Sequence, residues 1–142
     1  MMGGFSFLNF VVDFFNKIRN MVRFRSFGLL FSDIRASLPS STVFSHGGLG
    51  VVIGHNVTVG KNVRFYQGVT VGSRKSTESR SAVYPVIGDN CVLYAGCAVL
   101  GNIRLGRGVV VGANSVVLED VPDGCTVVGN PARIVDCRSS QM

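Results

Sequence analysis

Two histidines, His46 and His55, are the side chains of this sequence best suited to proton transfer near neutral pH. An unperturbed imidazole has a pKa of about 6.5, so it can take the proton of an attacking hydroxyl and return it to a leaving group. His46 precedes a Gly-Gly pair, where other backbone or a ligand can approach closely. His46 is therefore a candidate general base. His55 falls where a turn would face outward, and we interpret it as a surface residue.

Residues 51–133, which follow His46, show a repeating pattern with a period of six residues. The first position of each unit is aliphatic or Phe, and the second is Gly in six of ten units. The units begin at Ile53, Val59, Phe65, Val71, Ile87, Leu93, Val99, Leu105, Val111 and Val117. Self-similarity at a fixed short period is typical of a solenoid.

A period of six matches neither the spacing of a helix nor the alternation of a lone strand. It matches a short strand followed by a turn, and three such sides form a triangular coil of about eighteen residues. This coil would stack Ile53 on Val71 and Ile87 on Leu105. A β-sandwich would need turns about every 8–12 residues, which the spacing contradicts. The sequence therefore predicts an all-β solenoid.

Residues 73–85 interrupt the period, because Val71 and Ile87 are sixteen residues apart. A solenoid accommodates such an insertion as a loop that protrudes from one corner. The insertion is basic and rich in hydroxyl groups, and loops on a rigid scaffold often bind ligands. A tolerated insertion without a function is the alternative.

A chain of 142 residues is long enough for one domain, and the ends of its solenoid need caps. We expect an N-terminal amphipathic helical segment over 1–38, the β-helix over 39–135 and a polar tail over 136–142. Polar side chains recur at helical spacing along residues 5–21. This helix is too short to span a bilayer. It either packs on the coil or a neighbouring subunit, or makes a peripheral membrane contact through residues 5–25.

The net charge narrows the classes of partner that this chain could bind. The formal net charge is +6, but sparse aromatic interleaving argues against nucleic acid. An anionic cofactor, an anionic glycan or a membrane surface fits this charge.

Cys91 and Cys97 occupy inward positions of consecutive units, which suggests buried thiols rather than a disulfide. No ligand spacing predicts a metal, and we expect a reducing, cytoplasmic compartment.

The repeats and the two segments that flank them resemble the hexapeptide-repeat acyltransferases, which fold as a left-handed parallel β-helix. The flanking segments read His46-Gly-Gly-Leu-Gly-Val-Val-Ile-Gly54 and Val127-Val-Gly-Asn-Pro-Ala-Arg-Ile-Val135. The resemblance covers about residues 33–135. It is greatest to the serine acetyltransferase branch and its relatives that O-acetylate bacterial capsular and exopolysaccharides. It implies a homotrimer with active sites between subunits.

The same resemblance implies roles for several polar residues. The family's catalytic His lies in the context that surrounds His46. An upstream Asp orients that His, and Asp33 is its counterpart, although the gap to His46 is two residues shorter here. The family's loop carries a second His where this chain has Tyr84. We expect Tyr84, with Arg80 of the same loop, to contact the acceptor.

The acyl donor that the resemblance implies is acetyl-CoA, with its pantetheine arm in a groove between neighbouring subunits. Small residues would line this groove, and by motif position they are Gly72, Ala95 and Ala113. Arg133 would meet the nucleotide phosphates. Related enzymes often carry Lys where Glu119 stands, so the phosphate site is expected to differ here.

Tyr84 departs from the family's amino-acid-binding pattern, and the large helical N-terminal domain of the serine acetyltransferases has no counterpart in this sequence. We therefore expect an O-acetyltransferase that modifies a sugar hydroxyl of a bacterial surface polysaccharide or its precursor. It would act in the cytoplasm, with association at the inner face of the membrane as one arrangement. The alternatives are a serine O-acetyltransferase of cysteine biosynthesis and a non-catalytic β-helix scaffold.

Overall fold

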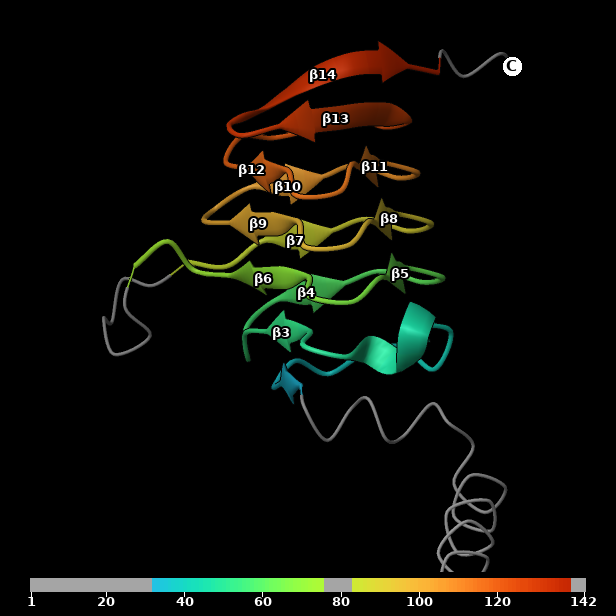
Figure 1. Ribbon diagram of the computed structural model, residues 1–142, viewed down its shortest axis with the longest axis vertical. Helices are drawn as coiled ribbons and strands as arrows, with labels where there is room; N and C mark the ends of the chain where they lie inside the picture. Colours follow the sequence, from blue (N-terminus) through green and yellow to red (C-terminus); the bar gives the residue numbers. More distant parts are fainter. Residues whose placement is uncertain (1–31, 76–82, 139–142) are drawn as a thin grey trace, which may run out of the picture.

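The computed structural model describes residues 32–75 and 83–138. Apart from one short 3-10 helix, Ser45–Gly48, the regular structure of this part consists of β-strands of two to six residues. The strands wind into coils that stack along one axis (Figure 1).

Three sheets form the walls of the coil, and neighbouring strands are parallel in every pair except the last. The five-stranded sheet contains, in spatial order, β1 (Asp33–Ile34), β3 (Val52–Ile53), β6 (Thr70–Gly72), β9 (Ala98–Leu100) and β12 (Val116–Val117). The three-stranded sheet contains β10 (Arg104–Leu105), β7 (Val86–Ile87) and β4 (Thr58–Val59). The six-stranded sheet contains β14 (Ala132–Cys137), β13 (Cys125–Gly129), β11 (Val110–Val111), β8 (Val92–Leu93), β5 (Arg64–Phe65) and β2 (Val43–Phe44).

The strand register follows the period of six. Ile53 pairs with Val71, and Ile87 pairs with Leu105, which confirms the predicted stacking. The chain leaves the coil after β6 and returns at β7, and Val71 still pairs onward with Val99. The strand register is therefore the same on both sides of residues 73–85, and the same positions of each unit face the core.

The interior of the coil is filled by the aliphatic residues at the first position of each unit. The largest fully buried side chains are Phe65, Ile53, Ile87, Leu93 and Leu105. Cys91 and Cys97 are buried and free, which confirms the prediction of buried thiols. Burial raises the pKa of Cys91 to about 11 and that of Cys97 to about 12, because a thiolate would lose its hydration there.

The last two strands leave the parallel pattern. β13 and β14 form an antiparallel pair at the C-terminal end of the coil (Figure 1). A disulfide joins Cys125 and Cys137, a bond that the sequence analysis did not predict. The hairpin sets these residues opposite each other and carries the β-structure past residue 135, into the expected polar tail. The disulfide departs from the wholly reduced cysteines that the sequence analysis expected.

The predicted helix over residues 5–21, with its packing or membrane role, lies outside the described residues. The division into segments at residue 39 stays a prediction, although β1 already joins the five-stranded sheet before that point. Within residues 32–75 and 83–138, no helix is long and apolar enough to cross a bilayer.

Candidate active site

His46 lies at the corner that joins β2 to β3, inside the short turn Ser45–Gly48. Its φ of 54° and ψ of 33° fall in the left-handed region, which residues other than glycine adopt rarely. Gly47 and Gly48 also have positive φ, so the Gly-Gly pair is what allows the chain to turn here. The imidazole is exposed. Unusual backbone of this kind often occurs at functional sites, and here it presents a proton acceptor at the surface.

The corners that follow β5, β8 and β11 stack on the His46 corner and form one edge of the coil, which we call the histidine edge. Ala95 and Ala113 lie on this edge, in the corners after β8 and β11. Backbone hydrogen bonds connect successive corners: Gly68 N to Leu49 O (2.8 Å), Gly96 N to Gln67 O (3.0 Å) and Asn114 N to Ala95 O (2.9 Å). His46 and two of the predicted donor-binding residues therefore share one edge.

Two tyrosines that the sequence analysis missed also lie on the histidine edge. The ring of Tyr66, directly after β5, has its centroid 5.9 Å from that of the His46 imidazole. Tyr94, directly after β8, stacks on Tyr66 at 4.8 Å. A signal was present in the sequence: both occupy the second position of a unit, where six of the ten units have Gly.

Asp33, the predicted orienting partner of His46, lies on β1 and is exposed. Its Oδ1 accepts a hydrogen bond from Nε of Arg35 at 2.8 Å, and this bond with the accompanying ion pair raises the pKa of Arg35. Among the described residues, no side chain forms a hydrogen bond with His46. The pairing of Asp33 with His46 stays a prediction.

Gly72 and Tyr84 lie on a different edge. Gly72 ends β6 and Tyr84 precedes β7, so both flank the corner from which the loop leaves. This loop edge joins the five-stranded to the three-stranded sheet, whereas the histidine edge joins the six-stranded to the five-stranded sheet. One chain therefore does not bring these residues to His46. Arg80, in the same loop, lies outside the described residues.

Tyr84 is buried, with 9% of its surface exposed. Its ring covers Gly54, where an added Cβ would lie 2.7 Å from Tyr84 Cε1. The ring of His55, an exposed residue, meets Tyr84 edge-on at 5.0 Å. The buried Tyr84 hydroxyl has no hydrogen-bond partner in the described part of the chain. These contacts favour a packing role for Tyr84, the alternative to contact with an acceptor.

Gly72 has no structural need to be glycine within one chain. A Cβ added there would meet no atom within 4 Å, and its φ is outside the left-handed region. Gly54 differs, because the Tyr84 ring leaves it no room for a side chain. The open space beside Gly72 suits a ligand or a neighbouring subunit.

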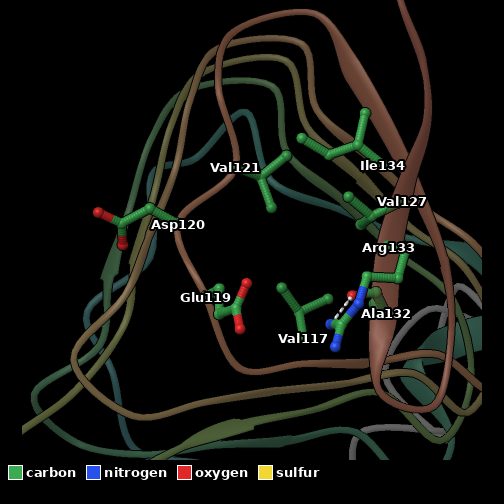
Figure 2. A pocket seen from close by; sticks show the side chains of 8 residues that line it. All are labelled: Val117, Glu119, Asp120, Val121, Val127, Ala132, Arg133 and Ile134. Atoms are coloured by element: carbon green, nitrogen blue, oxygen red, sulfur yellow. Dashed lines mark hydrogen bonds between the residues drawn. The ribbon is translucent and has the colours of Figure 1, made fainter.

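Arg133 lies on β14 beside a cavity of about 300 Å³ at the C-terminal end of the coil. Figure 2 shows Glu119 and Arg133 among the side chains around this cavity, with a hydrogen bond from Arg133 Nη1 to the Ala132 carbonyl at 2.8 Å. Gly72, Ala95 and Ala113 do not line it. The four predicted donor-binding residues are therefore not gathered at one place in a single chain.

Comparison with known proteins connects this coil to one group of enzymes. Residues 84–119 match the family model "Bacterial transferase hexapeptide (six repeats)". A serine acetyltransferase of Staphylococcus aureus (strain Mu50 / ATCC 700699) is 50% identical over 93 residues, which cover 66% of this chain and 43% of the relative.

Two solved structures have the same coil. A serine acetyltransferase in complex with cysteine matches with a TM-score of 0.65 and 36% identity, over 72% of this chain and 41% of its own. A serine acetyltransferase in complex with CoA matches with a TM-score of 0.59 and 34% identity, over 74% of this chain and 39% of its own. This chain spans less than half the length of these relatives, and its fold is a left-handed parallel β-helix, as predicted.

The comparisons overturn the expected acceptor. The sequence analysis favoured a sugar hydroxyl of a surface polysaccharide, largely because Tyr84 replaces a loop histidine of the serine acetyltransferases. That expectation is wrong, since the relatives at 50% identity and the matching structures are serine acetyltransferases. The physical reason is the position of Tyr84, whose buried ring packs against Gly54 and gives no information about the acceptor.

Proposed function

We infer that this chain, whose coil is a hexapeptide-repeat β-helix of the serine acetyltransferase type, transfers an acetyl group from acetyl-CoA to the hydroxyl of serine. The observation that carries the proposal is the exposed His46 imidazole, held at a left-handed corner on the edge that also bears Ala95 and Ala113. We place this reaction in the cytoplasm, where acetyl-CoA is available.

His46 would act twice in this reaction. Its neutral imidazole accepts the hydroxyl proton as the serine oxygen attacks the carbonyl carbon of the thioester. A carbon–oxygen bond forms, and the tetrahedral intermediate then collapses as the carbon–sulfur bond breaks. The imidazolium returns its proton to the departing thiolate, so the products are O-acetylserine and CoA. An imidazole suits both steps because its usual pKa lies near neutral pH.

The small residues are suited to holding the extended arm of acetyl-CoA. Ala95 and Ala113 place only small side chains in two corners of the histidine edge. The space next to Gly72 is open. Arg133, exposed at the C-terminal end, carries a positive charge that can pair with the nucleotide phosphates. Together, these residues would position the thioester beside His46.

The proposed active site is shared between two copies of the chain. His46, Ala95 and Ala113 come from the histidine edge of one copy, while Gly72 and the loop that contains Arg80 come from the loop edge of the next. A cyclic homotrimer repeats this contact three times and leaves no site incomplete.

The test is thiol release from acetyl-CoA by the full-length chain in the presence and absence of serine, with O-acetylserine identified by mass spectrometry. We expect His46→Ala to lower kcat at least about a hundredfold, because general base catalysis contributes a factor of this order. His55→Ala is the matched control, since it removes the only other imidazole of the sequence. It should lower kcat far less than His46→Ala, because the exposed His55 ring packs on Tyr84 and is not the proton acceptor of the proposed reaction.

Two results would overturn the proposal. One is the absence of serine-dependent thiol release by the folded wild-type chain. The other is full turnover by the His46→Ala variant, which would remove the assignment of the base.

A further inference from the structure

A general base must be held in one orientation, and a hydrogen bond to a ring nitrogen is the usual means. Neither ring nitrogen has a hydrogen-bond partner among the described residues. The carboxylate of Asp33, the expected partner, accepts its hydrogen bond from Arg35 instead. Because a misplaced catalytic group loses much of its effect, a ring contact that restricts this imidazole would support catalysis.

The ring of Tyr66 makes that contact. Its centroid lies 5.9 Å from the centroid of His46, with an angle of 49° between the ring planes. Aromatic rings attract each other at centroid separations of about 4.5–7 Å. Within residues 32–75 and 83–138, this is the one aromatic ring in contact with His46.

Tyr66 is itself held firmly by its coil and by Tyr94. Its backbone N–H donates to the carbonyl of Leu93 at 3.0 Å. Its ring stacks on that of Tyr94 at 4.8 Å, with 28° between the planes. Phe65 pairs with Leu93 in the parallel sheet, so the residues that follow them, Tyr66 and Tyr94, are stacked by the strand register. The stacked rings of Tyr66 and Tyr94 thus lie beside His46, which belongs to a turn.

We propose that Tyr66 is the positioning residue of His46 and that Tyr94 fixes the orientation of Tyr66. This inference rests on the proposed role of His46 as the base. The contact is made by the aromatic ring and not by the phenolic hydroxyl. The ring blocks part of the space in which the imidazole could turn.

Kinetics of three full-length variants test the proposal. Tyr66→Ala should lower kcat by about tenfold to a hundredfold, the range expected when a catalytic group is misplaced by about 1 Å. The KM for acetyl-CoA should change much less than kcat, because the proposed role of the ring is to orient the base and not to bind the donor. Tyr66→Phe keeps the ring, so its kcat should stay close to the wild-type value. Tyr94→Ala should cause a smaller fall than Tyr66→Ala, in the same direction.

A second measurement does not depend on turnover. The sequence has two histidines, so their imidazole proton resonances can be assigned with His46→Ala and His55→Ala. In Tyr66→Ala the His46 resonances should move as the ring current of Tyr66 is lost, while those of His55, which contacts Tyr84, stay in place. This spectrum also shows whether the variant is folded.

The outcomes separate the two proposals. Unchanged His46 resonances, or wild-type kcat, in a folded Tyr66→Ala variant would overturn the positioning role alone. Loss of kcat in Tyr66→Phe equal to that in Tyr66→Ala would overturn the ring contact as its cause. A wild-type chain without activity on serine would refute the proposed function, and the His46 resonances would still decide whether Tyr66 orients the imidazole.

Discussion

At the scale of single residues, the corners of the coil combine unusual backbone conformations with polar side chains. The four described residues other than glycine with positive φ are His46, Asn62, Asn90 and Asn114. Asparagine tolerates this conformation well, and the Asn62 amide also donates to Asn90 at 3.3 Å, one coil further along. His46 lacks such a bond to a neighbouring coil in the described part of the chain. The left-handed corner leaves the His46 imidazole exposed.

The two buried thiols lead to a prediction at this scale. Burial raises the pKa of Cys91 to about 11 and that of Cys97 to about 12, from an ordinary value of 9.0. Above pH 9 the unfolded chain releases these protons and the folded chain retains them, so the free energy of unfolding falls as the pH rises toward 11. The fall should be at most about 1.4 kcal/mol per pH unit for each thiol.

Urea unfolding between pH 8 and pH 10 measures this dependence, with Cys97→Ala as the comparison. The variant should lose stability less steeply with pH than the wild type, since one titrating thiol is gone. Equal slopes would contradict the prediction. Both thiols should also resist a thiol reagent at pH 8 until the chain is unfolded.

At the scale of elements, the hairpin of β13 and β14 extends the six-stranded wall at the C-terminal end of the coil. Solenoid ends need caps, because the last coil otherwise exposes its apolar interior. Val117, Val121 and Val127 form the apolar end of the interior here, and β14 passes beside them (Figure 2). Cys125 and Cys137 join the two strands covalently, so the cap is held by a disulfide as well as by strand pairing.

Loss of this disulfide should weaken the cap. Cys137→Ser is expected to lower the free energy of unfolding by about 3 kcal/mol, the magnitude typical for a closed loop of this length. Guanidinium unfolding checks the value, and hydrogen exchange of the β14 amides locates the effect. Reduction of the wild-type chain should reproduce it, whereas equal stability of variant and wild type would show that the bond does not anchor the hairpin.

At the scale of the whole molecule, the coil separates its candidate site residues onto two edges. His46 lies on the histidine edge and Gly72 on the loop edge, and a rigid column of parallel strands cannot bring them together within one chain. Assembly is the remaining route to a complete site. The proposed function therefore predicts that activity depends on contact between copies.

Mixed assemblies test that dependence. His46→Ala and Gly72→Trp should each be inactive, since one removes the base and the other fills the open space beside β6. Unfolding and reassembly of an equal mixture should restore activity at about a quarter of the sites, because some interfaces of a cyclic trimer combine an intact His46 with an intact Gly72. No restored activity would place both residues in sites formed by a single chain.

Much of this molecule could be predicted from local pattern. The period of six predicted the triangular coil, the stacking of Ile53 on Val71 and the burial of Cys91 and Cys97. It also predicted where the loop interrupts the coil. These features follow from the sequence because the same positions of every repeat face inward. The motif that begins at His46 also pointed to this imidazole, and the Gly-Gly pair that follows it permits the turn at the first corner.

Tertiary structure alone decided which residues meet. The edge on which a side chain lies depends on the strand register across residues 73–85, and the structure buries Tyr84 on the loop edge. The contact of Tyr66 with His46 joins two coils, and the disulfide depends on a hairpin that breaks the repeat. Repeating sequence determines what each coil looks like, whereas contacts between coils arise from register and from the departures from the repeat, which are not local properties.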